Sequence, residues 1–316
     1  MMNERLMNEA GIKRKRSFSK VLSRYWQLYL LLLIPVIYIL IFNYYPMFGL
    51  QIAFKKYSAK AGIWGGKWIG LQYFVKLFST YRFSEIIRNT LVVSLYTVFV
   101  NIPVPTALAL MINAARRNKY KKVVQMVSYM PHFISTVVVV SLLKQLFNSR
   151  IGMFAQVAGW FGGTIPNLFA SPEAFPHLYV WSGIWQNIGW SSIIYIAALS
   201  QVDLEQHEAA IVCGATRFQR VWYVDLPAII PTIVTLFILN MGKVMSLDFE
   251  KAYLMQNSLN ISTSEIISSY TYKVGLSGNI DFSYGTAIGL FNSVINLILV
   301  LIADRIGKRV SGNGLF

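Results

Sequence analysis

Charge is scarce in this sequence. Of its 316 residues, only 13% are Asp, Glu, Lys or Arg, whereas 55% are hydrophobic. Soluble domains carry about 25% charged residues, so the shortage excludes an ordinary soluble domain. Long apolar runs that hold few charges are typical of segments that cross a lipid bilayer. The sequence therefore predicts an all-α integral membrane protein.

Acidic residues are especially few. The chain has 13 Asp and Glu against 29 Lys and Arg, a formal net charge of +16. A strongly basic chain can bind nucleic acid, but here the basic residues cluster beside apolar runs and not on a soluble domain. The positive-inside rule explains that placement. We therefore expect no nucleic-acid partner, and we expect Lys13-Arg14-Lys15-Arg16 to anchor the N-terminal tail to anionic lipid.

The chain has a single cysteine and no nucleotide-binding motif. Cys213 is the single cysteine, so the chain forms no internal disulfide. Residues 62–67 (GIWGGK) have the glycines and lysine of a phosphate loop, but their spacing is wrong, and Trp68 stands where Ser or Thr would hold magnesium. We expect no catalytic residue, no metal site and no cofactor in this chain, and we predict that it is not an enzyme.

The apolar residues form six runs long enough to cross a bilayer. We expect six transmembrane helices, at residues 28–45, 90–112, 123–147, 178–199, 227–247 and 285–303. Met130-Pro131-His132 interrupts the third run. The first run follows basic residues, as in a signal peptide. However, it is long and no small-residue cleavage site follows it, so we expect it to be retained.

The basic residues predict the orientation of these helices. The N-terminal tail, the 113–122 and 200–226 loops and the C-terminal tail hold 17 of the 29 Lys and Arg residues. The other loops, 46–86, 148–177 and 248–284, are longer and hold fewer basic residues for their length. The positive-inside rule therefore predicts that both termini are cytoplasmic. We expect a basic tail at residues 1–26, one transmembrane domain at 27–305 and a cytoplasmic tail at 306–316.

The loop between the fourth and fifth predicted helices is a short polar stretch. Asp203 is suited to an N-cap, and Gln206 at the third helical position predicts a capping box. Gly214 can adopt a positive φ and end the helix. A second short helix is expected at about 217–224, and Pro227 fits the first turn of the fifth span. From composition alone, a docking site for another protein and an ordinary amphipathic surface helix are equally good interpretations.

Several residues of this loop resemble the EAA signature of ABC importer permeases. Glu208-Ala209-Ala210 is followed four residues later by Gly214, and Leu226-Pro227 lies downstream. Residues 223–232 (YVDLPAIIPT) continue the match. Within that superfamily the chain is similar to the carbohydrate-uptake group, which includes the two membrane subunits of the maltose importer. Residues 44–55 (YYPMFGLQIAFK) resemble the branch that imports oligo-uronides and alginate.

The resemblance implies an ATP-driven importer in the bacterial cytoplasmic (inner) membrane. In this family two homologous permease subunits form the pathway, two cytoplasmic ATPases bind ATP and magnesium, and an extracytoplasmic solute-binding protein delivers the sugar. The ATPases move the EAA helix, here the coupling helix between the fourth and fifth spans. Its coupling residues would be Glu208, Ala209, Ala210, Gly214, Ala215, Leu226 and Pro227. The chain departs from the carbohydrate group at Cys213, where an acid is usual.

Polar residues within the spans are candidates for the saccharide pathway, because sugars bind to planar amides and aromatic rings. These candidates are Gln186, Asn187 and Trp190 on the fourth span and Asn240 and Lys243 on the fifth. Hydrogen bonding between helices would explain each of them equally well. Lys243 is a cation at depth and needs a partner, either an acidic saccharide or one of the chain's acids, Asp248 or Glu250. Together with the lysines of the outer loops, it favours an anionic substrate such as alginate or an oligo-uronide.

Other functions fit some of these observations. A secondary transporter or channel that works alone would need no ATPase, but such proteins more often carry paired acids within their spans. Permeases for neutral oligosaccharides, peptides, amino acids or phosphate share the EAA signature. An ATPase with a phosphate loop among the co-purifying chains would distinguish an ABC importer from the first alternative.

Overall fold

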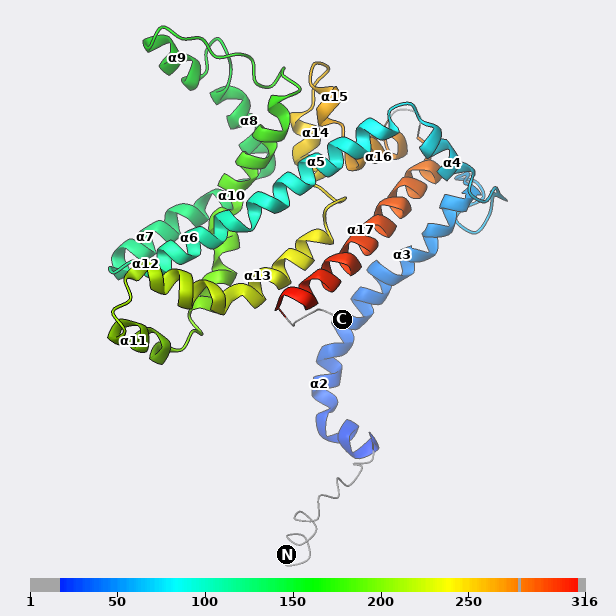
Figure 1. Cartoon of the computed structure of the whole chain (residues 1–316). Coiled ribbons are helices and arrows are strands. Elements are labelled where there is room, and N and C mark those ends of the chain that lie inside the picture. The colour runs from blue at the N-terminus through cyan, green and yellow to red at the C-terminus, as the bar shows by residue number, and fades with distance from the viewer. Residues whose placement is uncertain (1–17, 278–279, 312–316) are drawn as a thin grey trace, which may run out of the picture. The chain divides into compact units, whose positions relative to one another are not determined.

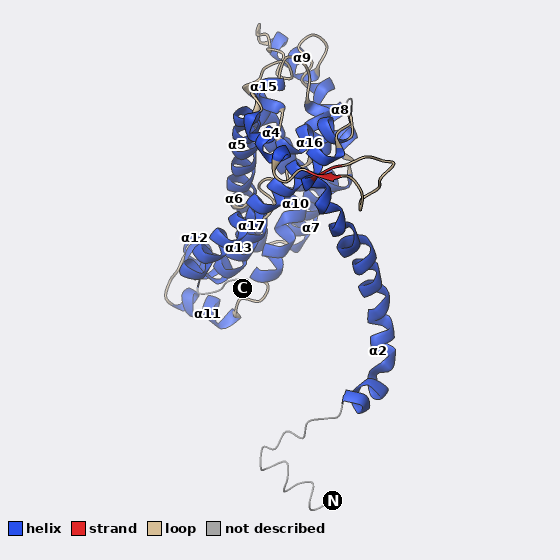
Figure 2. Ribbon diagram, turned by 90° about the vertical axis from the view of Figure 1, so that its right-hand side faces the viewer, coloured by secondary structure: helices blue, strands red, loops and turns tan. Residues whose placement is uncertain are grey.

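Helices make up nearly all of the regular structure in the computed structural model, which describes residues 18–277 and 280–311 (Figure 1). The all-α prediction is confirmed for this part of the chain, apart from one short antiparallel hairpin of β1 (Lys55–Lys56) and β2 (Lys67–Trp68), drawn in red in Figure 2. The chain divides into two compact units, Met1–Gln51 and Ile52–Phe316, and each is described by itself.

The first unit is a long helical run. It consists of α2 (Phe18–Ile39), the π-helical turn η1 (Leu40–Tyr44) and α3 (Tyr45–Met47), and it leads into the 3-10 helix η2 (Phe48–Phe54). The segment Arg24–Phe54 is long and apolar enough to cross a membrane. The first predicted span is therefore confirmed, and it is longer at both ends than the apolar run indicated.

Three further helical runs, all in the second unit, are long and apolar enough to span. Phe83–Ala114 combines α5 (Phe83–Asn101) with α6 (Pro103–Ala114), and it begins seven residues before the predicted start. Arg217–Met241 combines α12 (Arg217–Arg220), the π-helical turn η4 (Val221–Asp225) and α13 (Leu226–Met241). Phe282–Arg309 lies within α17 (Phe282–Ser311). The predicted break at residue 224 is wrong, because the chain stays helical from α12 into α13.

The two π-helical turns share one sequence feature. Each lies just ahead of a proline that occupies the second position of the next helix, Pro46 after η1 and Pro227 after η4. Proline has no N–H with which to continue the α-helical ladder. A wider turn ahead of it shifts the hydrogen-bond pattern and keeps the chain helical. Neither proline therefore ends its helix.

The third predicted span is interrupted at Met130-Pro131-His132, as predicted, and the interruption is a sharp bend. α7 (Asn118–Tyr129) and η3 (Met130–Phe133) are followed by α8 (Thr136–Leu146), with a bend of 99° between them. Pro131 lies within the tight η3 turn, and Ile134 after it is extended. Ser135 then starts α8 in a new direction, because its side chain accepts a hydrogen bond from the Val138 N–H at 3.4 Å.

The fourth predicted span is the 26-residue helix α10 (Ala174–Leu199). At 1.5 Å per residue it is about 39 Å long, enough to cross a hydrocarbon core of ~30 Å. The described residues hold four helices that are long and apolar enough to span, or five if the bent pair is one span. α10 is more polar than these and would be the sixth, so six spans and the positions of the termini stay predictions.

α10 is the central element of the second unit's core. The N-terminal half of α10 packs with α5 and α14 through Phe175, Tyr179 and Val93. Its C-terminal half packs with α6 and α13 through Tyr195 and Leu199. A Cβ atom at Gly189 would overlap the Ser128 carbonyl of α7, so only glycine permits this close crossing.

All three predicted outer loops contain helices. The 248–284 segment holds α14 (Phe249–Met255), α15 (Ile261–Ser264) and α16 (Ile267–Gly275), and the two other segments hold α4 (Gln72–Ser79) and α9 (Met153–Trp160). Met255 and Ile266 are fully buried against α10 and α5. The loop prediction for 248–284 is wrong because these apolar residues belong to the core.

Candidate functional site

The predicted coupling helix exists as α11 (Leu204–Val212). The Asp203 side chain accepts a hydrogen bond from the Glu205 N–H at 3.0 Å and caps its N-terminus, as predicted. The capping box predicted with Gln206 is wrong, since the structure forms that motif between Thr216 and Gln219 at the start of α12. Both helices in this loop therefore begin at a defined side-chain cap.

Gly214 ends α11 with a φ of +79°. The Gly214 N–H donates to the Ile211 carbonyl at 2.9 Å, and the Ala215 N–H donates to the Ala210 carbonyl at 2.9 Å. These two bonds form a Schellman motif, which satisfies carbonyls that the helix end leaves open. The predicted positive φ is confirmed, and it fixes the direction in which the chain leaves α11.

The surface of α11 is open. None of its residues is buried, and Leu204, Ile211 and Val212 are 67%, 55% and 87% exposed. Glu208 is exposed and makes no ion pair among the residues that the structure describes. Exposed apolar side chains beside an unpaired acid are suited to docking against another protein.

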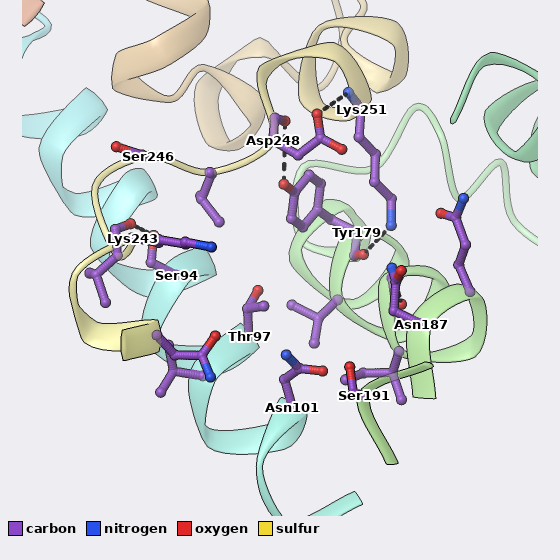
Figure 3. A pocket seen from close by; sticks show the side chains of 18 residues that line it. Ser94, Thr97, Asn101, Tyr179, Asn187, Ser191, Lys243, Ser246, Asp248 and Lys251 are labelled. Carbon is purple, nitrogen blue, oxygen red and sulfur yellow. Dashed lines mark hydrogen bonds between the residues drawn. The ribbon is translucent and has the colours of Figure 1, made fainter. Parts of the chain in front are cut away.

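Polar side chains of α5 and α10, the end of α13 and α14 line a cavity of about 310 Å³ (Figure 3). That volume lies at the lower end of the ~300–1,000 Å³ range of ligand pockets. Four of the five predicted pathway residues lie in its wall, namely Gln186, Asn187, Asn240 and Lys243. Hydroxyl and amide groups that the sequence did not single out complete it: Ser94, Thr97, Asn101, Ser191 and Ser246.

The three predicted amides are held in place by backbone carbonyls. Gln186 Nε2 donates to the Ile134 carbonyl at 2.8 Å, beyond its own helix. Asn187 Nδ2 and Asn240 Nδ2 donate within their own helices, at 3.0 and 2.8 Å. One N–H of each amide is therefore used structurally, and the side chain is fixed in the cavity wall.

Lys243 lies in a turn beyond the end of α13 at Met241, so its predicted place within a span is wrong. Gly242 follows the last helical residue, and glycine favours helix ends. The Lys243 side chain is exposed and extends into the cavity in Figure 3. Within the described chain it forms no ion pair, so neither Asp248 nor Glu250 serves as its partner.

A second lysine, Lys251 of α14, lies in the same cavity wall and is only 4% exposed. Its Nζ donates to the Tyr179 carbonyl at 2.9 Å and lies 4.9 Å from the centre of the Tyr179 ring. A Cβ atom on Gly183 would come within 3.1 Å of that Nζ, so the glycine provides its space. Burial lowers the pKa of Lys251 to about 8, and the nearby Asp248 carboxylate opposes that shift.

The remaining predicted pathway residue lies elsewhere. Trp190 is not part of the cavity wall. Its ring stacks on His132 of η3, with 4.5 Å between the ring centres and 6° between the planes. His132 Nδ1 also lies 2.9 Å from Asn187 Oδ1. The histidine therefore links Trp190 to the cavity through Asn187.

Comparison with protein families identifies the chain. Residues 101–312 match the model for the binding-protein-dependent transport system inner membrane component. The chain belongs to this family of ABC importer permeases. The match covers α11 and, of the helices that line the cavity, α10, α13 and α14, but only the last residue of α5, Asn101.

The relatives of the permease include subunits of saccharide transport systems. It is 41% identical to the polygalacturonan/rhamnogalacturonan transport system permease protein YteP of Bacillus subtilis, over 96% of this chain and 94% of that protein. It is 40% identical to protein LplB of the same organism, over 95% and 94%. Since YteP is a transport system permease and the family consists of inner membrane transport components, the permease is a multi-pass membrane component of a sugar importer and not an enzyme.

Two solved structures share the fold. One is a bacterial ABC transporter involved in the import of the acidic polysaccharide alginate, with a TM-score of 0.85 and 37% identity over 92% of this chain and 98% of that chain. The other is a bacterial alginate ABC transporter in complex with an alginate pentasaccharide-bound periplasmic protein, with a TM-score of 0.86 and 36% identity over 95% of the permease and 100% of that chain.

The sequence missed the buried cation of the cavity. Lys251 lies in a segment expected to be a loop, and only Asp248 three residues earlier, which caps α14, could have indicated a helix there. Its burial depends on Tyr179 and Gly183, about 70 positions away in the sequence. No local pattern contains that information.

Proposed function

We propose that the permease is one of two membrane subunits of an ATP-driven importer for acidic oligo- or polysaccharides. A homologous second permease, two cytoplasmic ATPases that bind ATP and magnesium, and an extracytoplasmic solute-binding protein complete the transporter. One observation carries the choice of substrate: two lysines project from different elements into one amide- and hydroxyl-lined cavity. The import of acidic polysaccharides by relatives of similar fold supports it.

Lys243 would be the main contact for a uronate carboxylate. It is exposed in the cavity and has no ion-pair partner in the described chain. An ion pair at 4 Å and an effective dielectric of 20 is worth about 4 kcal/mol before desolvation. A neutral sugar offers the same hydroxyls to the amides but no charge for this lysine. The cavity therefore favours the acidic saccharide.

Asp248 also lines the cavity, and an acid there would repel a uronate. Its carboxylate is already engaged, because Oδ1 accepts the Lys251 N–H at 3.4 Å and caps α14. The positive charge of Lys251 also interacts with the negative charge of Asp248 and compensates it. The three charged side chains therefore leave the cavity with one net positive charge, that of Lys243.

The second part of the proposal concerns coupling. The exposed helix α11 would insert into a groove of the ATPase, with Glu208, Ala209 and Ala210 on the contact surface. The Gly214 turn and Ala215 would hold the helix end, and Leu226 and Pro227 would carry its movement into α13. Leu226 supports this role, since it packs against Ala109, Tyr195 and Ile229 at the base of α6, α10 and α13.

Transport of matched saccharides tests the substrate proposal. The complete transporter is reconstituted in liposomes, and uptake of an oligo-uronate is compared with uptake of a neutral oligosaccharide of equal length. We expect Lys243→Gln to lower oligo-uronate uptake about 10-fold, equivalent to ~1.4 kcal/mol, and to leave neutral uptake unchanged.

Lys119→Gln is the matched control, because Lys119 is an exposed lysine outside the cavity. It should leave both uptake rates at the wild-type value. Equal uptake of the two saccharides by the wild type, or an equal loss of both in Lys243→Gln, would show that the importer handles neutral sugars.

A further inference from the structure

Asp225 is a buried acid at the cytoplasmic end of α13 as the proposed orientation has it. The residue is only 3% exposed and occupies the last position of η4, directly before Leu226-Pro227. Its Oδ1 lies 3.2 Å from His207 Nε2 and accepts a hydrogen bond from Asn113 Nδ2 at 3.3 Å. Two donors from different elements therefore converge on one carboxylate oxygen.

A second basic group faces the same carboxylate. Arg220 of α12 interacts electrostatically with Asp225. Its Nε is buried and has no hydrogen-bond partner among the residues that the structure describes. The Asp225 carboxylate therefore has three polar groups around it, an arginine, a histidine and an amide donor, each from a different element.

The elements that meet at Asp225 are those that a coupling movement has to reach. His207 belongs to α11, Asn113 lies near the end of α6, and Asp225 leads into α13. Lys121 of α7 extends the network, because its Nζ donates to the Asn113 carbonyl at 3.0 Å. One chain of polar contacts thus runs from α11 to three helices of the transmembrane domain.

His207 is the contact through which α11 is attached. No residue of α11 is buried, and the His207 side chain is partly covered, at 21% exposed. In the described part of the chain, the His207–Asp225 pair is the single side-chain hydrogen bond or ion pair that joins α11 to another element. The loops at its two ends make the other connection between α11 and the rest of the chain.

We propose that His207 is a positioning residue for transport. Through its ion pair with Asp225, it fixes α11 on the base of α13 and α6, so that a displacement of α11 moves both helices together. The inference rests on the coupling role of α11 proposed above. Without the pair, α11 still docks on the ATPase, but its movement is absorbed by the 200–203 and 213–216 loops.

The ratio of saccharide transported to ATP hydrolysed tests this directly, because a purely structural role would lower both quantities together. The complete transporter is reconstituted with whichever saccharide the wild type imports. We expect His207→Ala to lower the ratio about 10-fold while ATPase activity persists. Gln206→Ala, an exposed neighbour on α11 without a side-chain partner in the described residues, should keep the wild-type ratio.

A double variant separates the pair from its members. Asp225→Asn should also lower the ratio, and His207→Ala/Asp225→Asn should be no worse than the more severe single variant, because both remove one link. Two independent, multiplying losses would overturn the proposal. A wild-type ratio in His207→Ala would do so as well.

A conservative variant covers the case in which His207→Ala fails to assemble. His207→Gln keeps an N–H donor close to Asp225, so it should restore assembly and most of the ratio of saccharide transported to ATP hydrolysed. If His207→Gln assembles but its ratio is as low as that of an uncoupled transporter, the proposal is overturned. Failure of the underlying coupling role looks different. In that case Glu208→Lys leaves the ratio unchanged, whereas loss in Glu208→Lys together with no loss in His207→Ala overturns this inference alone.

Discussion

Gly214 illustrates how one backbone angle determines the geometry of the coupling loop. Its φ of +79° lies in the left-handed region, and a Cβ atom there would meet no other atom within 4 Å. A side chain at this position is therefore strained by the backbone and not by a collision. Forcing a β-branched residue into this region costs about 1–2 kcal/mol or more.

That strain predicts a graded effect on transport. We expect Gly214→Val to lower sugar uptake and sugar-stimulated ATPase activity together while the complex still assembles, because the Schellman turn cannot hold α11 in its direction. Gly214→Asn is the control, since asparagine tolerates positive φ far better, and it should retain most of the activity. Wild-type coupling in Gly214→Val would contradict the role of the turn.

Lys251 predicts a pH dependence of stability. Burial lowers its pKa to about 8 in the folded protein, from the usual 10.5. The unfolded chain therefore holds this proton more tightly, and the cost of burying the charge is fully present below pH 8. It is relieved as the pH rises from about 8 to about 10.5. At pH 9.5 the relief amounts to about 2 kcal/mol.

The comparison with Lys251→Met isolates this effect. We expect the thermal unfolding midpoint of the purified wild type to rise relative to that of Lys251→Met between pH 7 and pH 9.5. Lys119→Met, in which an exposed lysine is replaced, should follow the wild type at every pH. Parallel midpoints for the wild type and Lys251→Met across this range would contradict the lowered pKa.

At the residue scale, the sequence identified the polar residues of the cavity more reliably than their positions in the fold. Gln186, Asn187, Asn240 and Lys243 were recognised because polar side chains in apolar runs are rare, and the structure brings all four to one cavity. Residues whose role depends on long-range contacts were missed. Lys251 is buried only because Tyr179, 72 positions away, offers its carbonyl.

At the scale of elements, α11 is the clearest case of a helix whose two ends are set by local chemistry. Its caps at Asp203 and Gly214 were predictable from local chemistry, since both act through neighbours within a few residues. The bend between α7 and α8 was not. A proline break inside an apolar run is compatible with a kink or with a reversal, and only packing against α10, which Gly189 permits, distinguishes them.

The exposed face of α11 predicts sensitivity to charge reversal. Glu208 is exposed and unpaired within the described chain, so a docked ATPase would supply its partner. We expect Glu208→Lys to uncouple ATP hydrolysis from uptake, because like charges brought together at an interface cost several kcal/mol. Gln206→Lys places the same cationic side chain on the opposite face of the helix, with a charge change of one in place of two, and should have little effect. A compensating charge reversal on the ATPase should restore coupling in Glu208→Lys.

At the scale of the whole molecule, orientation connects the two candidate sites. Transport requires α11 on the side of the ATPases and the cavity on the path of the saccharide. The basic residues predicted this orientation through the positive-inside rule, and the helical fold of the described chain is compatible with either direction across a membrane. The apolar runs predicted a span at 178–199, and the structure has the helix α10 there, which is long enough to span and whose polar residues line the cavity.

Cys213 provides a direct test of the orientation. It is the single cysteine in the chain, it is exposed, and it lies at the end of α11. A membrane-impermeant maleimide should therefore label the permease in inside-out vesicles and not in intact right-side-out cells, with Cys213→Ser unlabelled in both. Because the docked ATPase would cover the end of α11, labelling should also fall when the ATPase is bound. Labelling of intact cells would place the 200–226 segment outside, and α11 could then have no contact with a cytoplasmic ATPase.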